Sequence, residues 1–112
     1  MSRQAKRHLS RMSREMCVEH ALAKVLPVTT STRIEVIDHD EIHDLLVFVE
    51  VGSNMATSEL SALAEKVRLC LAHLQRQNPD DPCLASWSAT FERGGERVVS
   101  VSVLDRAVSW LK

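Results

Sequence analysis

The chain has no tyrosine, and its 112 residues include only three glycines, three prolines and three cysteines. No apolar run approaches the roughly 20 residues of a membrane-spanning helix, so we expect no membrane association. The basic amino end lacks the apolar segment of a signal peptide, which argues against secretion by that route. Three cysteines are an odd number without framework spacing, which indicates free thiols in a reducing compartment, the cytoplasm.

Catalytic and cofactor motifs are also missing. The pair Gly94-Gly95 is followed by neither a helix start nor Lys-Ser/Thr, so it is not a phosphate-binding loop. The serines are spread through predicted strands and caps without the strand-to-helix turn of a nucleophile elbow. We therefore expect a protein that is not an enzyme, with no cofactor and no evident small-molecule substrate.

The charge is unevenly placed along what we expect to be a single domain, residues 1–112. The net charge is −1, yet residues 1–14 carry five basic residues and no acid, so the remainder carries −6. Residues 2–26 have helical periodicity, and Pro27 ends the helix. We expect the basic part, residues 1–14, to project beyond the domain, and its charge favours an electrostatic partner.

The clearest structural signal is a β-hairpin over residues 83–104, with a turn around Gly94-Gly95. The two strands can be paired through a loop with an even or an odd number of residues, and only the odd number puts the apolar side chains on one face. That pairing places Phe91 opposite Val99, Ala89 opposite Val101 and Trp87 opposite Val103. The opposite face then carries Ser86, Ser88, Thr90, Ser100 and Ser102. This parity predicts a loop of three or five residues with a left-handed glycine.

The remaining elements follow in order. Strands are predicted over residues 33–38 and 45–51, separated by an acidic turn, His39–Asp44. Thr57 or Ser58 caps a second helix, which ends before residues 78–82. Asp105 caps a last helical turn that includes Trp110. The order αββαββ(α) predicts an α+β fold: a four-stranded antiparallel sheet with two helices packed on one face, a permuted ferredoxin-like two-layer sandwich.

The strand Leu45–Val51 is apolar on both faces. Leu45, Val47, Val49 and Val51 share one face, while Leu46 and Phe48 share the other. Two helices cover only one face of a sheet this small, so the second face is either open to a partner or covered by the chain's own end. The predicted protein interface comprises Leu46, Phe48, Ser88, Thr90 and Trp110.

Arginines on successive turns of the first helix suit a phosphate backbone. Arg3, Arg7, Arg11 and Arg14 form one stripe, which makes nucleic acid a possible partner. Residues 11–16, which open a helix, together with the two strands and the second helix, resemble bacterial ribosome-binding factor A, a KH-like protein. The resemblance covers about half the chain, lacks the helix glycine (the matching place reads Ala64-Glu65-Lys66) and does not extend to the carboxyl-terminal hairpin, so it does not assign the chain to that family.

Two groups of residues have metal-ligand chemistry. Cys17 with His20, and Cys70 with His73, would place Cys-x-x-His pairs on neighbouring helices. The second group is the turn His39–Asp44, with its histidines and carboxylates. Core packing and ordinary turn composition explain both groups, so we expect no metal at either.

The sequence thus predicts a small protein–protein interaction module of the adaptor, chaperone, inhibitor or immunity type. It would bind through the open sheet face or the helix pair, with a protein partner that includes a second copy of the chain in a homodimer. The alternative is an RNA- or ribosome-associated protein that uses the basic amino-terminal helix.

Overall fold

The computed structural model describes residues 11–104 and 109–111, without the side chains of Arg11, Met12 and Ser109. The amino-terminal half contains α2 (Arg11–Ala23), β1 (Ser31–His39) and β2 (Ile42–Val51). The carboxyl-terminal half contains α3 (Thr57–Gln77), a short 3-10 turn η1 (Leu84–Ser86), β3 (Trp87–Arg93), β4 (Glu96–Ser102) and β5 (Ser109–Trp110). Residues 1–10, and with them most of the predicted projecting segment, lie outside the described residues.

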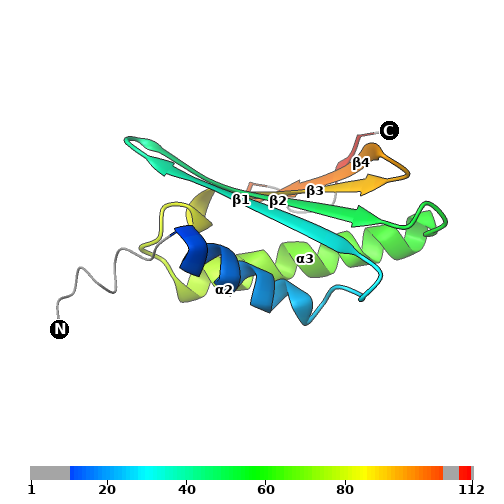
Figure 1. Cartoon of the computed structure of the whole chain (residues 1–112), viewed down its shortest axis with the longest axis horizontal. Helices are drawn as coiled ribbons and strands as arrows, with labels where there is room; N and C mark the ends of the chain where they lie inside the picture. The colour runs from blue at the N-terminus through cyan, green and yellow to red at the C-terminus, as the bar shows by residue number, and fades with distance from the viewer. Residues whose placement is uncertain (1–10, 105–108, 112) are drawn as a thin grey trace.

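The elements form two layers, as the sequence predicts for an α+β fold. Figure 1 shows α2 and α3 side by side beneath the sheet, and in the described part of the chain no helix lies on the other face. The strand order is β1-β2-β3-β4, with the two-residue β5 added at the β4 edge. None of the helices in the described ranges is long and apolar enough to cross a membrane.

The prediction of a wholly antiparallel sheet is wrong. β1–β2 and β3–β4 are antiparallel hairpins, but β2 and β3 are parallel neighbours, so the sheet is mixed. The reason lies in the length of α3. Its 21 residues span roughly 31 Å, close to the roughly 33 Å of the ten-residue β2, so one helix carries the chain back to the end where β2 began. A strand that starts there must run parallel to β2.

The hairpin pairing is confirmed, although the predicted loop length is wrong. Phe91 lies opposite Val99 and Ala89 opposite Val101, but the turn is the two-residue loop Gly94-Gly95, with φ of +62° and +83°. The parity is kept because the register shifts between Phe91 and Glu92, leaving Val98 as an extra residue in β4. This β-bulge restores the pairing parity that we expected from a loop with an odd number of residues.

The core lies between the sheet and the helices. The predicted stripe of α3 is buried, with Cys70 half-buried at its margin, and the helix begins after Ala56 rather than at a threonine or serine cap. On α2, Val18 and Leu22 are buried, whereas Cys17 is exposed. The inward side chains of the sheet are Leu45, Val47, Val49, Val51, Trp87, Ala89, Phe91, Val99 and Val101.

The carboxyl end differs from prediction. Trp110 lies in β5, where it pairs with Val99 of β4, rather than in a final helical turn. The proposed cap Asp105 lies outside the described residues. The backbone N–H of Leu111 also donates to the carbonyl of Val98, at 2.9 Å, so the bulged part of β4 offers the hydrogen-bonding groups that hold this end as a strand.

Candidate functional site

The open face of the sheet consists of four cross-strand rows, read from the strand register. One row runs Glu35–Leu46–Ser88–Ser102, and the next runs Arg33–Phe48–Thr90–Ser100. Ile37 and Asp44 lie beyond the first row, and Ser31, Glu50, Glu92 and Arg97 lie beyond the second. Leu46, Phe48, Ser88 and Thr90 are all partly exposed, so the structure brings these four predicted interface residues together on one surface.

Phe48 is the centre of this face. The guanidinium carbon of Arg33 lies 4.1 Å from the centroid of the Phe48 ring, and that of Arg97 lies 6.0 Å away. Both distances fall within the range of cation–π attraction. The ring therefore lies against two basic side chains from β1 and β4, on a sheet face that no described helix covers.

Trp110 does not belong to the open face. It lies directly opposite Val99, and directly opposed residues in an antiparallel pair point to the same side of the sheet. Val99 is buried in the core beneath the sheet, so Trp110 lies on the helix side, at the sheet edge. The interface prediction is wrong at this residue because the chain end forms a strand instead of a helix.

Arg14 is not available for a phosphate backbone. It is only 4% exposed, and its guanidinium bonds to Asp38 and Asp81. Burial alone would lower the pKa of Arg14, but the hydrogen bond to Asp81, the negative charge of Asp81 and the hydrogen bond to Asp38 raise it above its ordinary value. Of the other members of the arginine stripe, Arg3 and Arg7 lie outside the described residues, as does the side chain of Arg11.

Arg14 organises a polar cluster at one end of the sheet. Its Nη1 donates to Oδ2 of Asp38 at 3.0 Å, and its Nε donates to Oδ2 of Asp81 at 2.9 Å. The other carboxylate oxygen of Asp81 accepts the backbone N–H of Cys83 at 2.9 Å and that of Leu84 at 3.4 Å. One guanidinium thus joins α2 to β1 and to the segment that leads into β3.

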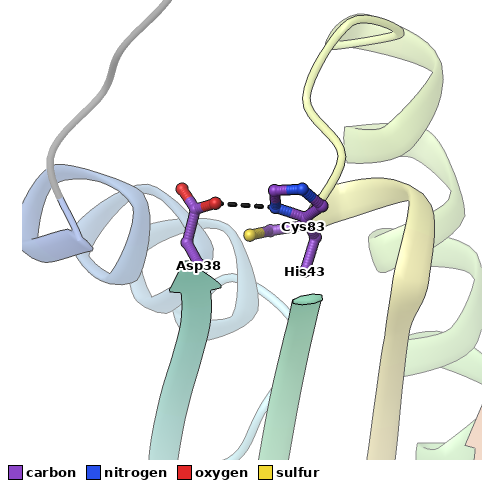
Figure 2. Close-up of side chains that lie close together, drawn as sticks. All are labelled: Asp38, His43 and Cys83. Atoms are coloured by element: carbon purple, nitrogen blue, oxygen red, sulfur yellow. Dashed lines mark hydrogen bonds and ion pairs between the residues drawn. The ribbon is translucent and has the colours of Figure 1, made fainter. Parts of the chain in front are cut away.

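A second set of groups adjoins this cluster. Nδ1 of His43 lies 2.7 Å from Oδ1 of Asp38, in a hydrogen bond that the carboxylate accepts, and Cys83 lies beside both side chains (Figure 2). The hydrogen bond from His43, followed by that from Arg14, holds the pKa of Asp38 below its ordinary value. These three residues come from β1, from β2 and from the segment before η1.

The arrangement does not suit nucleophilic catalysis. Cys83 is fully buried, and burial raises the pKa of its thiol, which donates to the carbonyl of Ile37 at 3.6 Å. A nucleophilic cysteine needs the opposite, a lowered pKa and access for a substrate. Asp38, His43 and Cys83 instead offer three metal-ligand atoms that lie within 4.8 Å of one another. From the predicted turn His39–Asp44, the structure brings only His43 into this group.

The two Cys-x-x-His pairs line a different feature, a groove of about 640 Å³ between α2 and α3. Cys17, His20, Cys70 and His73 all border it, together with Lys24 and Lys66. Among the described residues, however, only Asp38, His43 and Cys83 form a ligand group close enough to hold a metal. The structure therefore does not bring these two pairs together as a metal site.

The cluster around Arg14 at the sheet end was not predicted from the sequence, although the spacing of Arg14 and Asp38 in the sequence indicates that both face the core. Arg14, Val18 and Leu22 are spaced four residues apart and share one helix face, so the buried stripe of α2 extends back to Arg14. Similarly, Asp38 continues the alternation of Ile34 and Val36 toward the helix side. An arginine and an aspartate on the buried faces of neighbouring elements predict an ion pair.

Comparisons of the chain with protein-family models, with curated proteins and with solved structures found no match.

Proposed function

We propose that this protein is a small interaction module without enzymatic activity, and that it binds a second copy of itself through the open sheet face. The observation that supports this most directly is the position of Leu46 and Phe48. Both lie partly exposed in the middle of a sheet face that no described helix covers. Aromatic and aliphatic side chains in such a position are typical of the centre of a protein interface.

The neighbouring surface suits close approach. Ser88 and Thr90 on β3 lie beside Ser102 and Ser100 on β4, so four short hydroxyl side chains form a low surface next to Leu46 and Phe48. Short side chains let another sheet or helix approach the backbone, and hydroxyls donate or accept hydrogen bonds at an interface. The face thus combines an apolar centre with a polar surround.

The charges on this face favour a second copy as the partner. Arg33 and Arg97 flank Phe48, while Glu35, Asp44, Glu50 and Glu92 lie around them on the same surface. In a two-fold arrangement each patch meets its own copy, so a surface that carries both signs can pair its arginines with the acids of the partner. A surface of one charge sign would repel itself.

Sedimentation of the wild type and of Phe48→Asp tests this proposal. The wild type is expected to be a dimer, and Phe48→Asp to be a monomer, because the variant replaces the apolar centre of the interface with a charged carboxylate that would have to lose its water on association. Leu69→Asp is the matched control, since Leu69 is an exposed leucine of α3 that lines the helix groove. It should remain dimeric. A monomeric wild type, or a Phe48→Asp variant that still dimerises, would overturn the proposal.

Cellular roles that fit such a module are those of an adaptor, chaperone, inhibitor or immunity protein. The cysteines Cys17, Cys70 and Cys83 are all free thiols, which supports a reducing compartment, and we place the protein in the cytoplasm. A homodimer built on the sheet face would leave the groove between α2 and α3 open for another protein.

The second candidate function is RNA or ribosome association, favoured by the basic charge of residues 1–14. With Arg14 buried in an ion pair, it depends on Arg3, Arg7 and Arg11. Affinity for mixed RNA should then fall steeply with salt, and fall again in the Arg7→Ala/Arg11→Ala variant. An affinity that does not change with salt would exclude this function.

A further inference from the structure

We propose that Asp38, His43 and Cys83 form a zinc-binding site at the end of the sheet. Zinc prefers thiolate, imidazole and carboxylate ligands, and these residues supply one of each. Their ligand atoms all lie within 4.8 Å of one another, and the side chains converge from three separate segments of the chain (Figure 2). This assignment does not depend on the sheet face or on dimer formation.

The ligand atoms lie within about 1.5 Å of the spacing that zinc requires. Bonds of about 2.0–2.3 Å in a tetrahedron place neighbouring ligand atoms roughly 3.4–3.6 Å apart. Nδ1 of His43 and Oδ1 of Asp38 are 2.7 Å apart as hydrogen-bonded partners, so they must separate by less than about 1 Å to bind the ion. On binding, the Nδ1 proton moves to the other ring nitrogen, and the thiol of Cys83 releases its proton.

The local charge matches one divalent ion. Asp38 and Asp81 are carboxylates, and Cys83 becomes a thiolate when it binds zinc. Against these three negative charges the cluster has one positive charge, the guanidinium of Arg14. The remaining two negative charges are those that Zn²⁺ neutralises. Arg14 bonds to Oδ2 of Asp38, which leaves Oδ1 for the metal.

The surroundings hold the ligands in place before any metal arrives. Arg14 fixes the Asp38 carboxylate, and Asp81 fixes the backbone at Cys83 through its hydrogen bonds to two N–H groups. Such outer partners orient ligands and raise metal affinity. Cys83 is 0% exposed, whereas the side chains of Asp38 and His43 are each 32% exposed, so the ion enters from the aspartate–histidine side. Water fills the fourth position there.

Cobalt(II) titration of the full-length, chelator-treated protein tests the assignment. Co²⁺ replaces Zn²⁺ in such sites, and a Co²⁺–thiolate bond gives a charge-transfer absorption in the near ultraviolet. We expect one Co²⁺ per chain with this absorption, and its loss when Zn²⁺ is added, because zinc binds these ligands more tightly than cobalt. An absence of the thiolate absorption would overturn the proposal.

Variants assign the ligands. Cys83→Ser should abolish the thiolate absorption, and His43→Gln should weaken Co²⁺ binding by at least about tenfold. The matched controls are Cys17→Ser and His39→Gln, which change an exposed cysteine and an exposed histidine outside the ligand group and should bind Co²⁺ as the wild type does. If the buried Cys83→Ser variant does not fold, the Co²⁺ affinity of His43→Gln tests the site instead. Unchanged affinity in His43→Gln, or loss of binding in Cys17→Ser, would refute the site.

Discussion

The buried guanidinium of Arg14 lies 2.9 Å from Oδ2 of Asp81, 67 residues further along the chain. This contact ties the start of α2 to the segment that leads into β3, and the same guanidinium reaches Asp38 on β1. Three segments distant in sequence therefore meet at one charged side chain.

Replacing Arg14 with Met should lower the free energy of unfolding by about 3 kcal/mol, because it leaves the largely buried carboxylate of Asp81 without its counter-ion and removes one of the two partners of Asp38. Urea denaturation measures this. Arg33→Ala is the control, since its ion pair with Glu35 and its contact with the Phe48 ring both lie at the surface and should together contribute about 1 kcal/mol. Equal losses in the two variants would contradict the structural role of Arg14.

The two phenylalanines should differ in their contribution to stability. Phe91 is fully buried, so Phe91→Ala should cost about 3–5 kcal/mol through lost burial and a cavity. Phe48 lies partly exposed on the open face, so Phe48→Ala should cost about 1 kcal/mol. Urea denaturation of the wild type and both variants, at a protein concentration low enough to keep the chain monomeric, checks the assignment of faces. A larger cost at Phe48 would mean that the chain covers the face we describe as open.

The turn between β3 and β4 requires a residue that tolerates positive φ. Gly95 has φ of +83° with open space around it, so Gly95→Ala should cost about 1–2 kcal/mol from backbone strain alone. Gly95→Asn should cost less, because asparagine tolerates this conformation. Gly52→Ala is the control: φ at Gly52 lies outside this region, and a Cβ there meets only the flexible end of Asn54. Thermal unfolding should show the largest loss of melting temperature for Gly95→Ala, a smaller loss for Gly95→Asn and the smallest for Gly52→Ala.

Alkylation should separate the three thiols. Cys17 is exposed and should react with iodoacetamide first. Cys70 should react more slowly, because burial raises the pKa of its thiol and Lys24 only partly offsets this. The fully buried Cys83 should react last. Peptide mass spectrometry at a mildly alkaline pH measures the order, and denaturation in urea should remove it. Early labelling of Cys83 in the folded protein would contradict its burial.

In the β3–β4 hairpin, the local sequence pattern predicts the strand pairing but not the length of the turn. The alternation of Trp87, Ala89 and Phe91 against Val99 and Val101 allows only one apolar face, and the structure has that pairing. The same pattern cannot tell an odd loop from a two-residue loop followed by a bulge, because both give the same parity. Two glycines with positive φ and the extra residue Val98 are the solution that this chain adopts.

The candidate sites divide in a similar way. Strand alternation, which is visible in the sequence, puts Leu46, Phe48, Ser88 and Thr90 on one face, and the pairing of β2 with β3 makes them neighbours. The group Asp38, His43 and Cys83 is not visible there, because Cys83 lies 40 residues beyond His43 and reaches it only through the crossover of α3. Arg14 follows the arginine stripe in sequence, yet in the fold its side chain points to the core.

Periodicity in the sequence by itself determined the two helices, the four main strands, the two-layer α+β arrangement and the apolar faces, because each depends on contacts between residues near in the chain. Only the tertiary structure decided the parallel pairing of β2 and β3, the strand at Trp110, and the meeting of Cys83 with Asp38 and His43. The parallel pairing and the contact of Cys83 depend on how a helix about as long as a strand returns the chain across the sheet, and the strand at Trp110 depends on the hydrogen-bonding edge of β4. No local pattern encodes that geometry.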